Sequence, residues 1–138
     1  MSDAYAVEMI TVDDGPTALG RAGSFTLVAD RPVAGGGRGL GFNGGQLLNL
    51  AVAACISNDL YREAAKRQMA LTRVRVTVDA DYQGDPAVST PIVYDVEIDG
   101  QASAEALAEL IDHVDAIAEI PNSLRGGTEV RLRERSIG

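Results

Sequence analysis

Cys55 is the residue whose type offers this chain its most distinctive chemistry. It is the single cysteine in 138 residues, and a thiolate at this position could attack an electrophile or a peroxide oxygen. A cysteine in the middle of a helix gains little from the helix dipole, which acts within the terminal turns. A nucleophilic Cys55 therefore needs a side-chain cation, and the candidates are Arg21, Arg31 and Arg38. The alternative stays equally open, because a lone cysteine among Ala and Leu is usually an inert packing residue.

Three further polar residues are candidates to assist Cys55. Asn49 and Asn58 flank it on the same predicted helix, where they could bond to the backbone or to a ligand near the thiol. His113 could form a pair with Cys55 like that of a cysteine hydrolase, but no third group that would orient the histidine is evident. A surface or interface position for His113, on the exposed flank of its helix, is favoured.

A long helix over residues 46–68 is predicted to carry Cys55. Its first half, residues 47–56, is apolar on nearly every side, whereas its second half is amphipathic. A helix that is apolar all round must be enclosed by protein. In a chain this short, a sheet on one side and a second subunit on the other would enclose it most easily, so we expect a homodimer.

Segments rich in β-formers predict the strands around this helix. Residues 103–119 are predicted to form a second helix with Ser103 as its N-cap, and Pro121 either ends it or begins a new turn. We therefore predict a single α+β domain over residues 1–138 with the order ββ-α-ββ-α-β, in which the first two strands form a hairpin. The predicted strands cover residues 4–12, 24–30, 74–82, 92–99 and 129–133.

Charge and composition disfavour several classes of function. The net charge of −8 would repel a phosphate backbone, and the densest basic group forms a stripe on the last predicted strand, so nucleic-acid binding is disfavoured. The longest apolar stretch is too short to span a bilayer and no signal peptide is visible, so we expect a cytoplasmic protein without a membrane segment. One cysteine and one histidine cannot make a structural zinc site, and we expect neither a metal nor a cofactor. The basic stripe consists of Arg131, Arg133 and Arg135.

The segment from Gly41 to Cys55, GFNGGQLLNLAVAAC, resembles the central helix of the OsmC/Ohr family. That family combines a glycine-rich loop, a Leu-Leu pair, a stretch of small residues and an Ala-Cys step, and its order of elements is similar over nearly the whole chain. The resemblance implies an α+β fold and an intertwined homodimer. In the peroxidase branches it also implies reduction of organic hydroperoxides by two cysteines, assisted by an arginine and a glutamate.

Cys55 matches the first cysteine of this family, but the other catalytic parts differ. The second cysteine corresponds to Ile120, and the glutamate that usually opens the central helix corresponds to Gly45. The arginine near the first hairpin has no clear counterpart, because the matching stretch is residues 14–16. Since Ile120 cannot form a disulfide, a sulfenic acid at Cys55 needs an outside thiol to resolve it. The two-cysteine mechanism is therefore excluded.

Two functions remain as alternatives. The chain is either an OsmC-like protein with one-cysteine thiol chemistry, in which Cys55 attacks a hydroperoxide beside one of the three arginines, or a non-catalytic homodimer. In the second case it holds a small apolar ligand or acts structurally, with Cys55 as packing, and the missing catalytic parts favour this alternative on mechanism. The candidate pocket residues are Asn49, Asn58 and Ile120.

Overall fold

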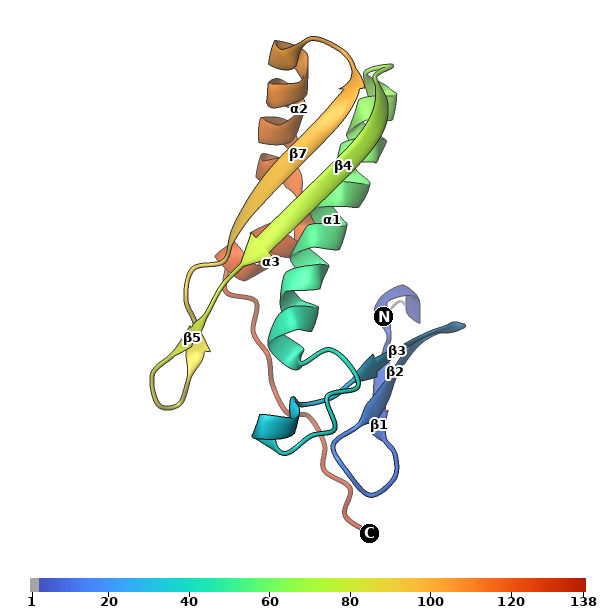
Figure 1. Cartoon of the computed structure of the whole chain (residues 1–138), viewed down its shortest axis with the longest axis vertical. Coiled ribbons are helices and arrows are strands. Elements are labelled where there is room, and N and C mark those ends of the chain that lie inside the picture. The colour runs from blue at the N-terminus through green and yellow to red at the C-terminus, as the bar shows by residue number, and fades with distance from the viewer. Residues whose placement is uncertain (1–2) are drawn as a thin grey trace. The chain divides into compact units, whose positions relative to one another are not determined.

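The computed structural model describes residues 3–138, and their contacts form two compact units, Met1–Leu48 and Asn49–Gly138 (Figure 1). The boundary between the units falls within the long helix α1, Gly44–Lys66. Each unit has antiparallel strands of its own, so the α+β class predicted from the sequence is confirmed.

A three-stranded antiparallel sheet forms the first unit, in the order β1-β2-β3. The central strand β2 was not predicted, and the predicted hairpin between the first two strands is wrong, because each of them pairs with β2. Gly20 lies within β2 and interrupts the run of β-forming residues by which a strand is recognised in a sequence. The elements are the 3-10 turns η1 (Asp3–Tyr5) and η2 (Val33–Gly35) and the strands β1 (Glu8–Thr11), β2 (Ala18–Ala22) and β3 (Phe25–Ala29).

The loop after β3 is organised around the buried carboxylate of Asp30. The hydroxyl of Thr17 donates to it at 2.9 Å, and so do the backbone N–H groups of Arg31, Arg38 and Leu40 at 2.7, 3.3 and 3.2 Å. Burial alone raises the pKa of Asp30, but these four donors outweigh it and hold the pKa below its ordinary value. The glycine-containing loop over residues 31–40 therefore folds back so that its backbone N–H groups donate to the carboxylate of Asp30.

Helix α1 begins with a reciprocal pair of hydrogen bonds. The side-chain oxygen of Asn43 accepts from the N–H of Gln46 at 2.8 Å, and the side-chain oxygen of Gln46 accepts from the N–H of Asn43 at 2.9 Å. This arrangement is a capping box with amide side chains, which satisfies N–H groups at the helix start. After the helix, Gln68 has a φ of 56° and reverses the chain into the next strand. The predicted range is 46–68, and the observed helix begins and ends two residues earlier.

The second unit pairs two long strands and covers them with helices. The predicted strands over residues 74–82 and 92–99 are confirmed as the antiparallel pair β4–β7, and the second helix has Ser103 as its N-cap, accepting from the N–H of Ala106 at 3.1 Å. Pro121 lies in the first turn of a further short helix. The elements are β4 (Ala70–Asp79), β5 (Tyr82–Gln83), β6 (Val88–Ser89), β7 (Val93–Gln101), α2 (Ala104–Ile117) and α3 (Glu119–Arg125).

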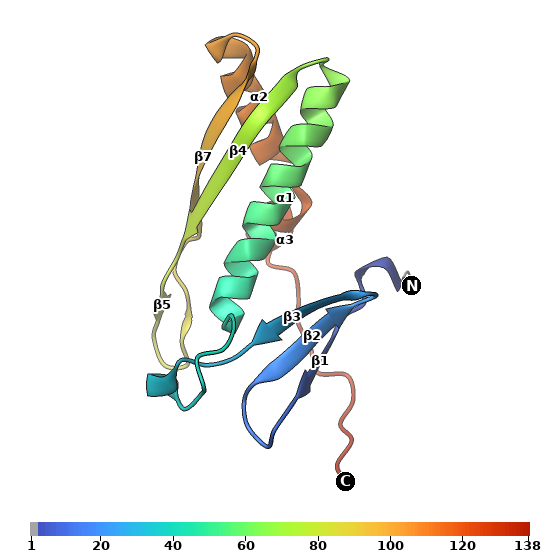
Figure 2. The same ribbon diagram turned by 45° about the vertical axis from the view of Figure 1, so that its right-hand side comes forward.

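The core of the second unit lies between α1, α2 and one face of the β4–β7 pair, as Figures 1 and 2 show. Alternate residues of the two strands face the helices, and the other face of the pair carries charged side chains such as Arg75, 3.4 Å from Glu97. Cys55 packs at the edge of this core. The buried core residues are Ile56, Leu60, Ala64, Leu110, Val114 and Ala118.

A polar cluster attaches α3 to the rest of this unit. The hydroxyl of Tyr94, on β7, donates to Asp115 of α2, and Arg125 of α3 lies 2.7 Å from the same carboxylate oxygen. Burial and the bond to Asp115 raise the pKa of Tyr94, while the bonds from Tyr94 and Arg125 outweigh burial and lower the pKa of Asp115. One carboxylate therefore joins a strand and two helices.

The predicted strand over residues 129–133 is wrong. No strand follows α3 among residues 126–138, and Val130 and Leu132 are almost fully exposed. Alternation alone does not make a strand, because a strand also needs a neighbour that accepts its hydrogen bonds. Without this strand, the basic stripe expected from Arg131, Arg133 and Arg135 does not form. The observed order is βββ-α-ββββ-αα.

The first half of α1 is covered on one side only within the second unit. Val52 and Ile56 are buried, whereas Leu50 is 46% exposed. This pattern differs from the complete enclosure expected from the apolar sequence. The second subunit that would cover the remaining side stays a prediction.

Candidate functional site

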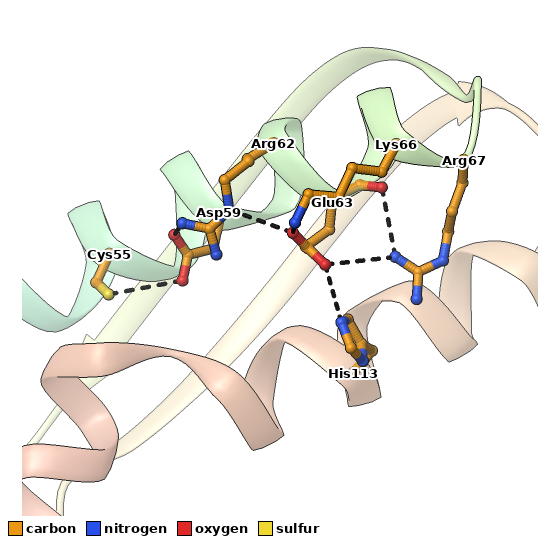
Figure 3. Close-up of polar contacts among 7 residues, drawn as sticks. All are labelled: Cys55, Asp59, Arg62, Glu63, Lys66, Arg67 and His113. Atoms are coloured by element: carbon orange, nitrogen blue, oxygen red, sulfur yellow. Dashed lines mark hydrogen bonds and ion pairs between the residues drawn. The ribbon is translucent and has the colours of Figure 1, made fainter.

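Cys55 is half-buried on α1 and faces a carboxylate one turn further along the helix. Its thiol donates to Oδ2 of Asp59 at 3.9 Å (Figure 3). Asp59 is only 6% exposed, and its other oxygen, Oδ1, lies 3.1 Å from Nη1 of Arg62. Cys55, Asp59 and Arg62 are spaced i, i+4 and i+7, which places them on one face of the helix. We call these three residues the thiol row.

Glu63 forms a second charged centre directly beside the thiol row. It is 4% exposed, and its Oε2 lies 2.7 Å from Nζ of Lys66 and 3.2 Å from Nε of Arg62. Its Oε1 lies 2.9 Å from Nε2 of His113, on α2 (Figure 3). Hydrogen bonds from Lys66 first and His113 second lower the pKa of Glu63 to about 2. Because an ionised carboxylate can only accept, Nε2 is the protonated nitrogen of His113.

His113 does not form the pair with Cys55, and its side chain is 38% exposed, which agrees with the surface position favoured from the sequence. The ring is half-buried and bonds to Glu63, so it connects α2 to α1. Asp59 and Glu63 likewise lie on the buried side of the amphipathic half of α1. Their burial is tolerated because each carboxylate faces at least one cation.

Arg62 is the cation closest to the thiol row's carboxylate. Its pKa is raised first by the hydrogen bond to Glu63 and then by the charge of Asp59, and Glu119 acts in the same direction. Glu119 begins α3, so the start of that helix contributes to the electrostatics around Arg62. Sequence reasoning missed Arg62 and Asp59 as site residues, although their spacing from Cys55 was a signal that could have identified them.

The pocket candidates on the helices differ in their exposure to solvent. Asn49 is half-buried and Asn58 is exposed, and within residues 3–138 neither side chain bonds to Cys55. Ile120 lies in the first turn of α3, directly after Glu119, and is partly exposed. Their part in a pocket stays a prediction.

The three candidate arginines all belong to the first unit. Arg21 is an exposed residue of β2 opposite Thr26, and Arg31 is exposed in the loop after β3. Arg38 is occupied, since its Nη2 donates to the carbonyl of Asp13 at 2.9 Å and its Nη1 lies 3.5 Å from the carboxylate of the same residue. Within the described chain, Arg21 makes no ion pair that would engage its guanidinium.

A cavity of about 510 Å³ opens on the sheet of the first unit. At its floor, a side chain on Gly20 would place a Cβ atom 3.1 Å from Cε of Met9 and 3.2 Å from Cδ1 of Leu27, so glycine lets these side chains approach the strand. Arg21 is the predicted site residue that lines this cavity. The apolar lining consists mainly of Val7, Met9, Phe25, Leu27 and Leu47.

The described residues contain neither a candidate metal site nor a helix able to span a membrane. Over residues 3–138 there is no group of three His, Cys, Asp or Glu side chains that could hold a metal ion. In the same range, no helix combines the length and hydropathy needed to cross a bilayer.

Comparisons with known proteins place this geometry in a family. The model of the family described as OsmC-like protein matches residues 35–133. Among solved structures, the chain is similar to an OsmC-like protein from Mycoplasma pneumoniae, with 20% identity, a TM-score of 0.79 and coverage of 93% of this chain and 92% of the other. It is also similar to an organic hydroperoxide resistance protein OsmC from Legionella pneumophila, with 20% identity, a TM-score of 0.63 and coverage of 88% of each chain.

At these identities the solved structures show a shared fold, and a comparison with curated proteins found no match. The family assignment rests on the family model, which covers well over half of the chain and includes the helix that bears Cys55. This chain belongs to the OsmC-like protein family.

Proposed function

We propose that this protein is a one-cysteine thiol peroxidase that reduces organic hydroperoxides at Cys55. The observation that carries the proposal is the hydrogen bond from the partly accessible Cys55 thiol to Asp59. The carboxylate of Asp59 is buried and forms an ion pair with Arg62. A cysteine that serves only as packing needs no acceptor for its proton, whereas a reacting thiol must give that proton up. Membership of the OsmC-like family and the similarity to a protein described as an organic hydroperoxide resistance protein support the same reaction class.

The reaction requires one cysteine and an outside reductant. The Cys55 sulfur attacks the terminal oxygen of the hydroperoxide, the O–O bond breaks, and the products are a sulfenic acid at Cys55 and an alcohol. Because Ile120 stands where a second cysteine would be needed, a low-molecular-weight thiol condenses with the sulfenic acid and releases water. A second molecule of that thiol then restores Cys55 and leaves as a disulfide. Such a cycle needs a reducing compartment, which agrees with a cytoplasmic location.

The proposed protein acts as a homodimer. Apolar side chains remain uncovered on both units: Leu50 is 46% exposed on α1, and Phe25 is 79% exposed on the sheet. Large apolar side chains that stay exposed in groups are typical of an interaction site. A second copy of the chain would cover it, and sedimentation is expected to report about twice the chain mass of 14.5 kDa. A mass equal to one chain would remove this part of the proposal.

Arg21 is the proposed electrostatic partner of Cys55 among the three candidate arginines. Arg38 is engaged by Asp13, whereas Arg21 has no ion pair in residues 3–138 and lines an apolar cavity. Arg21→Gln is therefore expected to slow hydroperoxide reduction more than Arg38→Gln does. Equal rates for the two variants would argue against this assignment.

The test of the reaction is consumption of cumene hydroperoxide in the presence of excess dithiothreitol. Wild-type protein is expected to accelerate the consumption, and Cys55→Ser is expected to reduce it to the rate of the buffer with dithiothreitol alone. Alkylation with iodoacetamide before the assay should have the same effect as the substitution. If Cys55→Ser consumes hydroperoxide as fast as wild type, the proposal is wrong.

A second candidate function is binding of a small apolar ligand in the cavity of the first unit. The cavity volume lies within the range of about 300–1,000 Å³ that is usual for small-molecule sites. Gly20→Leu would fill its floor, because even a Cβ atom there comes within 3.2 Å of two side chains. Binding of an apolar fluorescent dye to wild type and its loss in Gly20→Leu would favour this function. Equal dye binding by the two proteins would count against it.

A further inference from the structure

We propose that Asp59 is the acid–base partner of Cys55. It accepts the thiol proton as the sulfur attacks the hydroperoxide, and it delivers that proton to the departing alkoxide when the O–O bond breaks. The inference rests on the proposed peroxidase function and adds the group that moves the proton. It assigns a catalytic role to a residue of the same helix face, four positions after the cysteine.

The two oxygens of Asp59 have different partners, which suits a group that exchanges one proton. Oδ2 faces the sulfur of Cys55 at 3.9 Å, and Oδ1 faces the guanidinium of Arg62 at 3.1 Å. The side chain is buried, so water competes weakly for the oxygen that faces the thiol. A thiol can donate to this oxygen, so the contact provides a direct path for the proton between sulfur and carboxylate.

Arg62 orients Asp59 for the exchange. Its guanidinium lies 3.1 Å from Oδ1, which leaves Oδ2 to face the sulfur. Glu63 also holds Arg62 in place, because Oε2 of Glu63 lies 3.2 Å from Nε of Arg62. The negative charge of Glu119 likewise favours the charged form of Arg62. Arg62 is therefore a positioning residue, because it acts on the sulfur through Asp59.

The step balances as a two-electron transfer. The Cys55 proton passes to Oδ2 of Asp59 as the sulfur attacks the terminal hydroperoxide oxygen, forming an S–O bond. The O–O bond breaks, the sulfur is oxidised, and the alkoxide takes the proton from Asp59 and leaves as an alcohol. Asp59 returns to its carboxylate form, so only the outside thiol is consumed in closing the cycle.

The other candidates for an acid–base group are engaged elsewhere or missing. The position at which the family would place a glutamate is Gly45, which has no side chain. His113 bonds to Glu63 at 2.9 Å, and Glu63 itself is surrounded by cations that keep it ionised. Among residues 3–138, Asp59 is the carboxylate bonded to the thiol.

Two reagents that differ in their leaving groups separate the two roles of Asp59. Iodoacetamide loses iodide, which needs no proton, so its rate reports only the availability of the Cys55 thiolate. Cumene hydroperoxide loses an alkoxide, which needs one. Both second-order rates are measured at pH 7 on the reduced full chain, with intact mass as the readout, for wild type and Asp59→Asn.

Asp59→Asn is expected to separate the two rates. Alkylation should not fall, because iodide leaves without a proton. Oxidation by cumene hydroperoxide should fall by about 100-fold, the usual contribution of a positioned acid–base group. Asp115→Asn is the matched control, since it removes another arginine-paired carboxylate of the same unit that does not touch Cys55. It is expected to change neither rate.

Conservative variants test whether charge and proton transfer are the cause. Asp59→Glu keeps a carboxylate and should retain hydroperoxide oxidation even if Asp59→Asn fails to fold. Arg62→Gln should slow oxidation, and Arg62→Lys should restore it by returning a positive charge to Asp59. Complete loss of oxidation in a folded Asp59→Glu protein would overturn the inference.

The outcomes distinguish this inference from the function on which it rests. If wild-type Cys55 reacts with cumene hydroperoxide no faster than free cysteine, the peroxidase function itself is wrong. If wild type reacts rapidly and Asp59→Asn reacts equally fast, the function stands and the role of Asp59 is refuted. A parallel fall of both rates would also refute it, because that result indicates a structural effect.

Discussion

Tyr94→Phe is predicted to destabilise the second unit by weakening the attachment of its C-terminal helices. The substitution removes one hydroxyl that donates to Asp115 and leaves the ring in place. Hydrogen bonds to charged groups contribute about 1.5–3 kcal/mol when they are well buried. The Asp115 side chain is 48% exposed and keeps its contact with Arg125 at 2.7 Å, so the lower end applies. We expect a loss of about 1–1.5 kcal/mol, or about 4 °C in Tm for a chain of this length.

Urea unfolding at pH 7, followed by circular dichroism, measures this loss. Tyr82→Phe is the matched control, because Tyr82 is 47% exposed and its hydrogen bond to a side chain within residues 3–138 is made by its backbone N–H and not by its hydroxyl. Its effect should stay within about 0.5 kcal/mol, as for ordinary surface substitutions. In the Asp115→Asn background, Tyr94→Phe should cost measurably less, because its acceptor no longer carries a charge. A loss no greater than that of Tyr82→Phe would refute the reasoning.

Two further predictions concern the contact between α1 and α2. The pKa of Glu63 is lowered from 4.5 to about 2 in the folded state, so its contribution is fully present above pH 4.5 and is lost as the pH falls towards 2. Glu63→Gln should therefore be less stable than wild type at pH 7, and the difference should shrink on acidification through this range; a constant difference in acid unfolding curves would contradict the assignment. Leu110→Ala, at a fully buried core position, should cost about 2–5 kcal/mol in the same urea assay. Leu124→Ala, at a partly exposed position of α3, should cost clearly less, and equal losses would mean that the core is misplaced.

The sequence was sufficient to predict the elements that carry strong local patterns. The apolar run over residues 47–56 and the Ser103 cap identified the two main helices to within two residues at each end. Strict alternation likewise identified β4 and β7. In each of these segments, local preference and tertiary packing favour the same structure, so the pattern was reliable.

Elements that depend on a partner were missed or wrongly assigned. β2 is five residues long and contains Gly20, so its strand character comes from its pairing with neighbours on both sides. Residues 129–133 have the alternation of a strand but gain no neighbour within residues 3–138. Pairing is a non-local property, and alternation in one segment does not report it. The single domain over residues 1–138 stays a prediction.

The polar surroundings of the candidate site were the hardest to predict. His113 and Glu63 are 50 residues apart in the sequence, and nothing in either segment indicates that they meet. Asp59 and Glu63 were expected on a polar helix face, because charged residues are rarely buried unless they are paired. Their burial depends on cations that include Arg62, and only the folded helix brings these groups together.

The most direct test of the proposed peroxidase function is to treat the reduced protein with one equivalent of cumene hydroperoxide in the presence of dimedone, which traps sulfenic acids. Intact and peptide mass spectrometry then locate and time the product. We expect a single dimedone adduct, on Cys55, formed much faster than oxidation of free cysteine under the same conditions. An absent adduct, or one that forms no faster than with the urea-unfolded chain, would show that the fold does not activate this sulfur.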